Sequence, residues 1–345
     1  MAAVSLALAL VAAGCTSEPE EPQVAPTVTV PAVVVAAKAA PPQPVVPVVW
    51  PLTGQPTAEV AARPALAIKI ENSSQSRPQT GLEHADIVWE EVVEGGITRF
   101  VAVYHSQVPA AVEPVRSVRP MDPAIVAPMR PILAYSGAQQ QYIDAVGAAG
   151  IQSVIMDLGH AGFRRDRSRR APHNVIGDPA AFWAQADGAR AVPPPAQFAY
   201  GRAAGKSTAA TVGGPGGRLD VTMSRAHRSL WEWDGTAYVR SEGSRASVST
   251  SGARHAATNL VLLSVEVVNT PFRDPSGAPV PETQLIGSGE GVVAALGKSV
   301  PVLWSKAALD APIVLTLADG TPVKLEQGNT WVELVPRGSG SWAIS

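Results

Sequence analysis

Cysteine is nearly missing from this chain, since Cys15 is the only one in 345 residues. An internal disulfide and a cysteine-rich structural zinc site are therefore excluded, and the six histidines show no metal-ligand spacing, so we expect no metal and no cofactor. A strong charge of either sign is also missing, because 27 Lys and Arg residues face 29 Asp and Glu residues. This balance argues against nucleic acid as a partner, for which a strongly basic domain is expected.

Long hydrophobic runs are missing too. The run at residues 2–13 is too short to span a bilayer about 30 Å thick. It ends at Gly14-Cys15 and resembles the lipobox of a bacterial lipoprotein signal peptide, in which the cysteine thiolate accepts a diacylglyceryl group. We predict a signal peptide at residues 1–14 and a lipid anchor carrying palmitate on Cys15. An ordinary secretory signal is the alternative, because this segment has no Lys or Arg and Ala12 stands where Leu is usual.

Residues 15–48 are dominated by Pro, Ala, Val and Glu and contain no aromatic residue. This composition predicts a lipidated tether that reaches at most roughly 100 Å if it adopts polyproline II structure. Residues 33–35, three valines, leave open a strand docked on the fold. The anchor and the tether predict an extracytoplasmic protein on the outer face of the cell membrane. We expect the membrane as one partner and a cell-wall polymer or an envelope protein as another.

The chain after the tether predicts two domains. The first, at residues 49–190, alternates strand and helix patterns, which favours a sheet covered by helices. Gly95-Gly96 separates two runs rich in Val and Ile and predicts a two-residue hairpin in which Arg99 lies opposite Val92, within reach of Glu90 and Glu94. The strands expected in this domain cover residues 65–70, 87–94, 97–105, 131–135 and 153–156, and the helix covers residues 138–149.

The second domain, at residues 191–338, follows a proline run and a glycine-rich stretch at residues 213–217. Short β-prone runs then recur between turn residues, and residues 339–345 are expected to form a tail. The runs cover residues 219–223, 229–233, 238–240, 259–268, 313–317 and 330–335. The sequence therefore predicts an α+β protein, with an N-terminal α/β sandwich-like domain built on a mixed sheet and a β-rich C-terminal domain.

Several phrases are shared with a known family. In the first domain they are Pro51-Leu52-Thr53-Gly54, Arg77-Pro78-Gln79, residues 85–88, residues 94–100, Pro114-Val115-Arg116-Ser117, Arg119-Pro120 and Ala171-Pro172-His173-Asn174. In the second domain they are Gly287-Ser288-Gly289, Trp304-Ser305-Lys306 and residues 328–333. The chain in this way resembles the YerB-like bacterial lipoproteins, a family of two regions that implies no assigned activity. It departs from the family at Glu71, where Asp is usual, and at Glu113, where Gly is usual.

Arginines in the first domain predict a site for an anionic ligand, since guanidinium groups bind phosphate and carboxylate in bidentate fashion. The candidate residues are Arg99, Arg116, Ser117, Arg119, Arg165, Arg169, His173 and Asn174. Ion pairing at the surface is the alternative and fits Arg99 best. Arg116 and Arg119 have no adjacent acid before Asp122, and the run 164–170 sets five positive charges against one acid.

His173 is the candidate for proton transfer, although a histidine satisfied by a neighbour is the alternative. No Gly-x-Ser-x-Gly nucleophile motif is present, so the catalytic residues stay unknown. Residues 201–207 resemble a phosphate loop but are one residue short, and no strong helix pattern follows them. The tryptophans of the second domain, Trp231, Trp233, Trp304 and Trp331, favour core packing over stacking on sugars.

Two classes of function remain. The first is a non-catalytic envelope lipoprotein that binds an anionic ligand or a protein partner and acts as a scaffold or regulator of wall processes. The second is an envelope enzyme that acts on a phosphorylated or lipid-linked cell-wall glycan. We favour the first, because no catalytic constellation can be assembled from the spacing of the residues.

Overall fold

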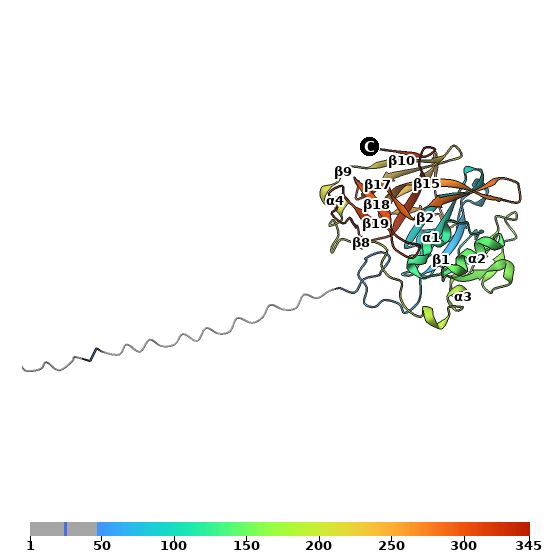
Figure 1. The fold of residues 1–345 in the computed structure, drawn as a ribbon, viewed down its shortest axis with the longest axis horizontal. Coiled ribbons are helices and arrows are strands. Elements are labelled where there is room, and N and C mark those ends of the chain that lie inside the picture. Colours follow the sequence, from blue (N-terminus) through green and yellow to red (C-terminus); the bar gives the residue numbers. More distant parts are fainter. Residues whose placement is uncertain (1–23, 26–46) are drawn as a thin grey trace, which may run out of the picture. The chain divides into compact units, whose positions relative to one another are not determined.

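The computed structural model describes residues 24–25 and 47–345. Cys15, the signal peptide at residues 1–14 and nearly all of the tether lie outside the described residues, so these assignments stay predictions. Within the described part, none of the helices combines the length and the apolar character that crossing a membrane requires. Residues Val46–Ser345 form one compact unit, and its arrangement is drawn in Figure 1.

A mixed sheet of twelve strands organises the described residues. Its N-terminal strands are β1 (Leu66–Glu71), β2 (Ile87–Val92), β3 (Thr98–Tyr104), β4 (Ile132–Tyr135) and β5 (Gln152–Ile155). The strands β1, β4 and β5 run parallel, and the first three strands are buried along their whole length. Helices α1 (Asp122–Val126), α2 (Gln140–Ala148) and α3 (Pro179–Trp183) accompany them. The strand and helix pattern predicted for this region is therefore confirmed.

The hairpin of β2 and β3 differs from the prediction in its register. The chain turns over residues 93–97, with Val93 N donating to Ile97 O, instead of over Gly95-Gly96 alone. Arg99 consequently lies opposite Glu91 and Val92 lies opposite Thr98. The prediction that Arg99 faces Val92 is therefore wrong by one residue, because both glycines adopt positive φ inside a longer turn.

The same sheet continues into the second half of the sequence. The C-terminal strands are β9 (Gly214–Pro215), β15 (Asn259–Arg273), β16 (Pro279–Gln284), β17 (Gly287–Ala295), β18 (Lys298–Lys306), β19 (Val314–Thr316) and β21 (Thr330–Pro336). Strand β21 is parallel to both of its neighbours, β15 and β2, with Thr330 paired to Asn259 and to Ile87. The second region is rich in strands, as predicted, although strands β16, β17 and β18 were not predicted from the sequence.

A second sheet of the described residues contains β10 (Arg218–Ser224), β11 (His227–Trp233), β12 (Tyr238–Glu242), β13 (Arg245–Ala246), β14 (Ala256–Ala257) and β22 (Ser341–Ile344). Trp231 of this sheet contacts Trp331 of β21, with the two ring centroids 5.0 Å apart, and Trp331 in turn contacts Phe100. Trp231, Trp304 and Trp331 are buried, which agrees with core packing, whereas Trp233 is half-buried at the margin of the core. Strand β22 forms from the segment expected to be a tail, because its residues pair with β10.

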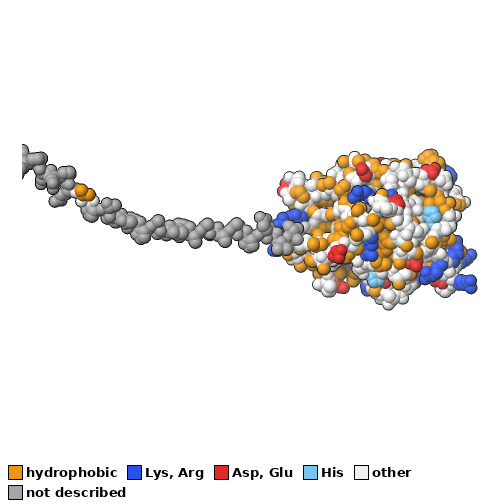
Figure 2. All heavy atoms as spheres, turned by 90° about the horizontal axis from the view of Figure 1, so that it is seen from below, with side chains coloured by type: hydrophobic (Ala, Val, Ile, Leu, Met, Phe, Trp, Pro, Cys, Tyr) orange, Lys and Arg blue, Asp and Glu red, His pale blue; other side chains and the backbone are white. Residues whose placement is uncertain are grey.

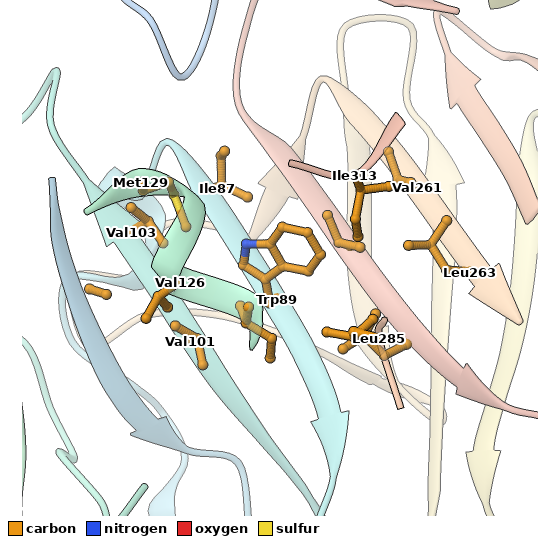
Figure 3. Close-up of a cluster of buried hydrophobic side chains, with 14 of the residues drawn as sticks. Ile87, Trp89, Val101, Val103, Val126, Met129, Val261, Leu263, Leu285 and Ile313 are labelled. Atoms are coloured by element: carbon orange, nitrogen blue, oxygen red, sulfur yellow. The ribbon is translucent and has the colours of Figure 1, made fainter. Parts of the chain in front are cut away.

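The other face of the large sheet forms a second core. Figure 3 shows Trp89 between Val126 and Met129, from the segment that starts with α1, and Val261, Leu263 and Ile313 from the C-terminal half. Residues from both predicted domains therefore share this core as well as the sheet. The boundary near residue 190 separates two regions of the sequence, whereas the described fold has one continuous sheet through both regions.

The remaining strands and α-helix are short. They are α4 (Thr208–Val212), the pair β8 (Ala199–Tyr200) with β20 (Lys324–Leu325), and the pair β6 (Phe163–Arg165) with β7 (Val175–Gly177). On the face shown in Figure 2, charged side chains of both signs lie among apolar and uncharged atoms, and Lys and Arg gather at the right edge of the folded part. Local accumulation of arginine is thus compatible with the near-neutral charge of the whole chain.

Candidate anion-binding site

Polar residues gather where the parallel strands of the large sheet end. Glu71 is the last residue of β1, Ser136 follows β4, and Asp157 comes two residues after β5. Arg99 enters the same edge from the start of the antiparallel strand β3. Ligands of open α/β sheets bind outside the carboxyl ends of the strands, so this edge is the place at which a site is expected.

Glu71 joins two of the predicted site residues. Its Oε1 atom lies 2.8 Å from His173 Nδ1, and its Oε2 atom lies 3.2 Å from Arg116 Nε. Ser73 also donates its hydroxyl proton to Glu71 Oε1, at 2.8 Å. The segment that carries Arg116 is held against β1, because Arg116 N donates to Lys69 O. The carboxylate therefore fixes the orientation of both the imidazole and the guanidinium group.

Arg99 and Arg119 lie next to Arg116. Arg99 Nη1 donates to the carbonyl of Ser117 at 2.6 Å, while Arg119 Nη2 donates to Glu94 Oε2 at 2.9 Å. Ser117 Oγ is 3.3 Å from Ser136 Oγ, which connects this segment to the end of β4. Burial, followed by the charges of Arg119 and Arg116, lowers the pKa of Arg99 to about 9.

This cluster contains three guanidinium groups around two carboxylates. Arg99, Arg116 and Arg119 are accompanied by the two carboxylates of Glu71 and Glu94. Next to it, Lys69 bonds to Glu91 and to Asp122, whose Oδ1 is 2.7 Å from Lys69 Nζ. Burial, with a further contribution from Asp122, raises the pKa of Glu91 to about 8. An added anion beside Arg99 would relieve the repulsion among the three guanidinium groups.

The other predicted residues form a second group at the end of β6 and in the β6–β7 loop. Arg165 Nη1 donates to Asn174 Oδ1 at 2.9 Å. Arg169 donates to the carbonyls of Ser76 and Pro78, and its Nε lies 3.6 Å from Glu113 Oε1. The structure therefore brings Arg99, Arg116, Ser117, Arg119 and His173 together, whereas Arg165, Arg169 and Asn174 stabilise the loop that carries His173.

A hollow opens beside His173. It has a volume of about 470 Å³, and its lining includes Gln75, Arg170, Pro172 and His173. Since His173 Nδ1 is engaged by Glu71, the other ring nitrogen is the one left for a molecule in this hollow. The arrangement can bind an anion and can hold a proton at His173.

Sequence adjacency did not reveal the acids of this site. Glu71 and Glu94 are far from Arg116 and Arg119 along the chain, and only the sheet brings them together. The ion-pair alternative therefore applies to Arg116 and Arg119, whereas Arg99, which it was expected to fit best, bonds to the carbonyl of Ser117. One feature of the sequence could have drawn attention to Glu71, because it occupies a position where the family usually has Asp.

The segment that resembles a phosphate loop is occupied by a carboxylate of the same chain. Gly205 N and Ser207 N donate to Glu326 at 2.9 and 3.4 Å. Helix α4 starts directly after Ser207 but has only five residues, although no strong helix pattern was expected there. The backbone donors are already satisfied by Glu326, which leaves this loop a structural role.

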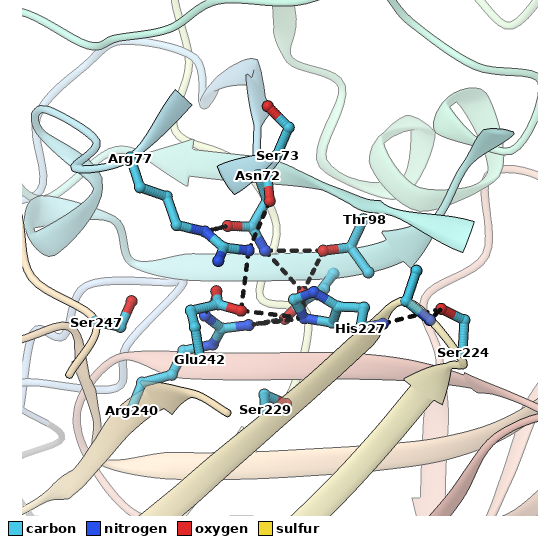
Figure 4. Close-up of polar contacts among 12 residues, drawn as sticks. Asn72, Ser73, Arg77, Thr98, Ser224, His227, Ser229, Arg240, Glu242 and Ser247 are labelled. Carbon is cyan, nitrogen blue, oxygen red and sulfur yellow. Dashed lines mark hydrogen bonds and ion pairs between the residues drawn. The ribbon is translucent and has the colours of Figure 1, made fainter. Parts of the chain in front are cut away.

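A buried polar network on the opposite face of the sheet was not predicted. Figure 4 shows Arg77, His227, Arg240 and Glu242 converging with Asn72 and Thr98. At its centre, Glu90 accepts from Arg240 Nη2 at 2.7 Å and lies 2.8 Å from His227 Nε2. Alternation along β2 explains the two faces, since Glu90 and its neighbour Glu91 point to opposite sides of the sheet.

Comparisons with known proteins agree with this architecture. Residues 52–192 match the family described as the N-terminal domain of a protein of unknown function (DUF3048), and residues 219–332 match its C-terminal domain. A stretch of 70 residues is 50% identical to "Putative lipoprotein YerB" of Bacillus subtilis (strain 168). It covers 20% of this chain and 21% of that protein, so the chain matches about a fifth of the length of this curated relative. The crystal structure of YerB from Bacillus subtilis shares the fold, with a TM-score of 0.72 at 23% identity over 86% of this chain and 99% of that one. The chain therefore belongs to the two-region DUF3048 family, to which its resemblance to the YerB-like lipoproteins pointed.

Proposed function

We propose that this protein is an extracytoplasmic lipoprotein, anchored through Cys15 to the outer face of the cell membrane. The apolar run that ends at Gly14-Cys15 supports the anchor, and so does the name of the Bacillus subtilis relative. Metabolic labelling with a palmitate analogue tests it. We expect label on the wild-type chain and none on Cys15→Ser, and an unlabelled wild type would contradict the anchor.

The folded part binds a compact anion at the carboxyl ends of the parallel strands. The supporting observation is the excess of positive charge around Arg99, where burial and two neighbouring guanidinium groups lower the pKa of that side chain. A phosphate or carboxylate group of a ligand would compensate this charge with charge-assisted hydrogen bonds. In this role the protein acts as a scaffold or regulator and performs no chemistry on the ligand.

Thermal unfolding of the full chain in a non-ionic detergent tests anion binding, with inorganic phosphate and sulfate as probes. A ligand at about 100 times its Kd stabilises the folded state by about 2.7 kcal/mol. We expect a phosphate-dependent rise in Tm for the wild type and its loss in Arg116→Ala. Arg218→Ala is the matched control, because Arg218 forms an exposed ion pair with Glu232 in the other sheet. A wild-type Tm that does not respond to either anion would contradict the proposal.

The pair of Glu71 and His173 supports an enzymatic function as the second candidate. A buried carboxylate that orients a histidine beside a hollow is an arrangement used for general acid–base catalysis. The substrate would be a phosphorylated or lipid-linked glycan, with its phosphate on Arg116. Turnover of a lipid-pyrophosphate glycan by the wild type, abolished in His173→Gln with phosphate binding retained, would establish this function. Absence of turnover with intact anion binding would leave the scaffold function.

A further inference from the structure

Two adjoining hollows lie over the buried network of Figure 4, and we name them together the twin hollow. The larger one has a volume of about 450 Å³ and the smaller one about 230 Å³. They share Arg77 and Glu242, whose Nη2 and Oε2 atoms are 3.0 Å apart, so this ion pair is a common wall. Arg225, His227 and Arg228 line the larger hollow, and Arg245 lines the smaller one.

The floor of the twin hollow is held rigidly. His227 Nε2 is 2.8 Å from Glu90, and Glu90 also accepts from Thr98 Oγ1 at 2.6 Å. Burial opposes the ionisation of Glu90, but the charges of Arg240 and His227 outweigh it and keep the pKa of Glu90 well below its usual range. Asn72 Nδ2 completes the frame by donating to Glu90 Oε1 at 3.1 Å. A ligand would therefore meet a surface that is already ordered.

The lining of the twin hollow is rich in arginine, although Arg77 is paired with Glu242 and Arg228 with Asp220. Four arginines line it, and its one acid, Glu242, is already bonded to Arg240 and lies 3.6 Å from His227. Arg225 and Arg245 are exposed, one in each hollow. In the larger hollow Ala226 is the one apolar side chain of the lining, whereas Pro78, Ala246 and Val248 line part of the smaller one. The shape and the charge together favour an elongated ligand with repeated negative charges.

We propose that the twin hollow binds a linear polyanion, a flexible chain that carries phosphate or carboxylate groups at short intervals. One part of the chain lies in the larger hollow near Arg225, and the next part passes the wall at Arg77 and reaches Arg245. Guanidinium groups suit both kinds of anion, because they form bidentate hydrogen bonds with each. This site is independent of the compact-anion site around Glu71, which lies on the other face of the sheet.

Titration calorimetry of the full chain in a non-ionic detergent tests the proposal with polyphosphate and poly-L-glutamate as probes. We expect binding of at least one polymer, at least about tenfold weaker in the double variant Arg225→Ala/Arg245→Ala, because two charge-assisted contacts are lost. The slope of log Kd against log salt should also fall by roughly 1 to 2, since fewer counterions are released. Which polymer binds distinguishes phosphate-bearing from carboxylate-bearing partners.

The matched control is Arg202→Ala/Lys206→Ala, which removes the same charge from two exposed residues that line neither hollow. A second test is Ser74→Glu, which adds a negative charge to the smaller hollow without touching Arg77 and should also weaken binding. Equal affinity in the wild type and the Arg225→Ala/Arg245→Ala variant would overturn the proposal, as would no binding of either polymer. Loss of phosphate binding in Arg116→Ala with unchanged polymer binding separates this site from the compact-anion site.

Discussion

Two glutamates in the interior of the protein lie side by side and differ in charge. Glu90 of β2 and Glu333 of β21 are register partners, and both are fully buried. Burial and the charge of Glu90 raise the pKa of Glu333 well above its usual range, while Arg240 holds Glu90 ionised. Trp231 Nε1 donates to Glu333 Oε1 at 2.8 Å, an interaction that a neutral acid can still accept. A carboxylic acid and a carboxylate thus occupy adjacent positions.

This difference in charge predicts that the same substitution, Glu to Gln, changes stability by different amounts at the two positions. Glu333→Gln replaces a neutral acid by a neutral amide, so the free energy of unfolding should change by less than about 1 kcal/mol at pH 7. Glu90→Gln leaves Arg240 short of a buried counter-ion and should cost about 3–5 kcal/mol. Urea unfolding of the two variants checks the prediction. Similar losses of stability in both would show that the two glutamates carry the same charge.

Glu91 predicts a pH dependence of stability. Its pKa is raised to about 8 in the folded protein, mainly by burial and then by Asp122, whereas the unfolded chain has an ordinary carboxyl pKa. The folded state therefore binds the proton more tightly, and stability falls as the pH rises from about 4.5 to about 8, by up to about 1.4 kcal/mol per pH unit. Urea unfolding across this range should show the slope in the wild type and a smaller slope in Glu91→Gln. An equal slope in both would assign the effect to another group.

At the scale of elements, the turn at residues 50–54 explains one of the shared family phrases. Gly54 has φ of +66°, and its amide donates to Trp50 O at 2.8 Å. A Cβ atom at Gly54 would lie 2.3 Å from Cγ of Tyr200, whose hydroxyl is bonded to Leu52 O. Only glycine satisfies both the backbone conformation and the close approach of this ring.

The turn predicts a large effect of a small substitution. Gly54→Ala should lower the free energy of unfolding by about 2–5 kcal/mol, because steric overlap adds to backbone strain. Gly235→Ala is the control, since Gly235 also has positive φ but nothing within 4 Å of an added Cβ, and it should cost about 1–2 kcal/mol. Equal losses in the free energy of unfolding, measured by urea unfolding, would mean that the ring of Tyr200 moves to make room for the added Cβ atom.

About half of the strands were predictable from the sequence, while their partners were not. Short runs rich in apolar residues and bounded by turn residues locate β1, β4 and β10, because local composition indicates where a buried strand begins and ends. The register of β2 and β3 depends on the length of the turn, which Gly95-Gly96 leaves undetermined. The acids that pair with Arg116 and Arg119 come from the end of β1 and from the turn after β2. The sequence therefore predicted a cluster of cations and could not predict how far their charge is neutralised.

At the scale of the whole molecule, strand β21 connects the two regions of the family. It lies between β15 and β2, and its Trp331 packs between rings of both regions. If the second region were absent, the outer edge of β2 would be exposed. The apolar faces of the first region that pack against the second region would be exposed too. Each region by itself therefore lacks part of its sheet and part of its core.

This arrangement predicts a single cooperative unfolding transition for residues 46–345. The calorimetric and van't Hoff enthalpies should agree, as they do for two-state unfolding. A fragment ending at residue 192 should show neither a sharp thermal transition nor dispersed amide resonances. Two separate transitions in the whole chain, or a stable N-terminal fragment, would show that the regions fold independently.

The position of β21 also has a consequence for biosynthesis. The edge offered by β2 is completed by a strand that leaves the ribosome more than two hundred residues later. Until that strand emerges, the main sheet cannot close, and the nascent chain stays open. A polypeptide that delays its own closure in this way stays extended for longer, which would suit the export that the proposed lipid anchor requires.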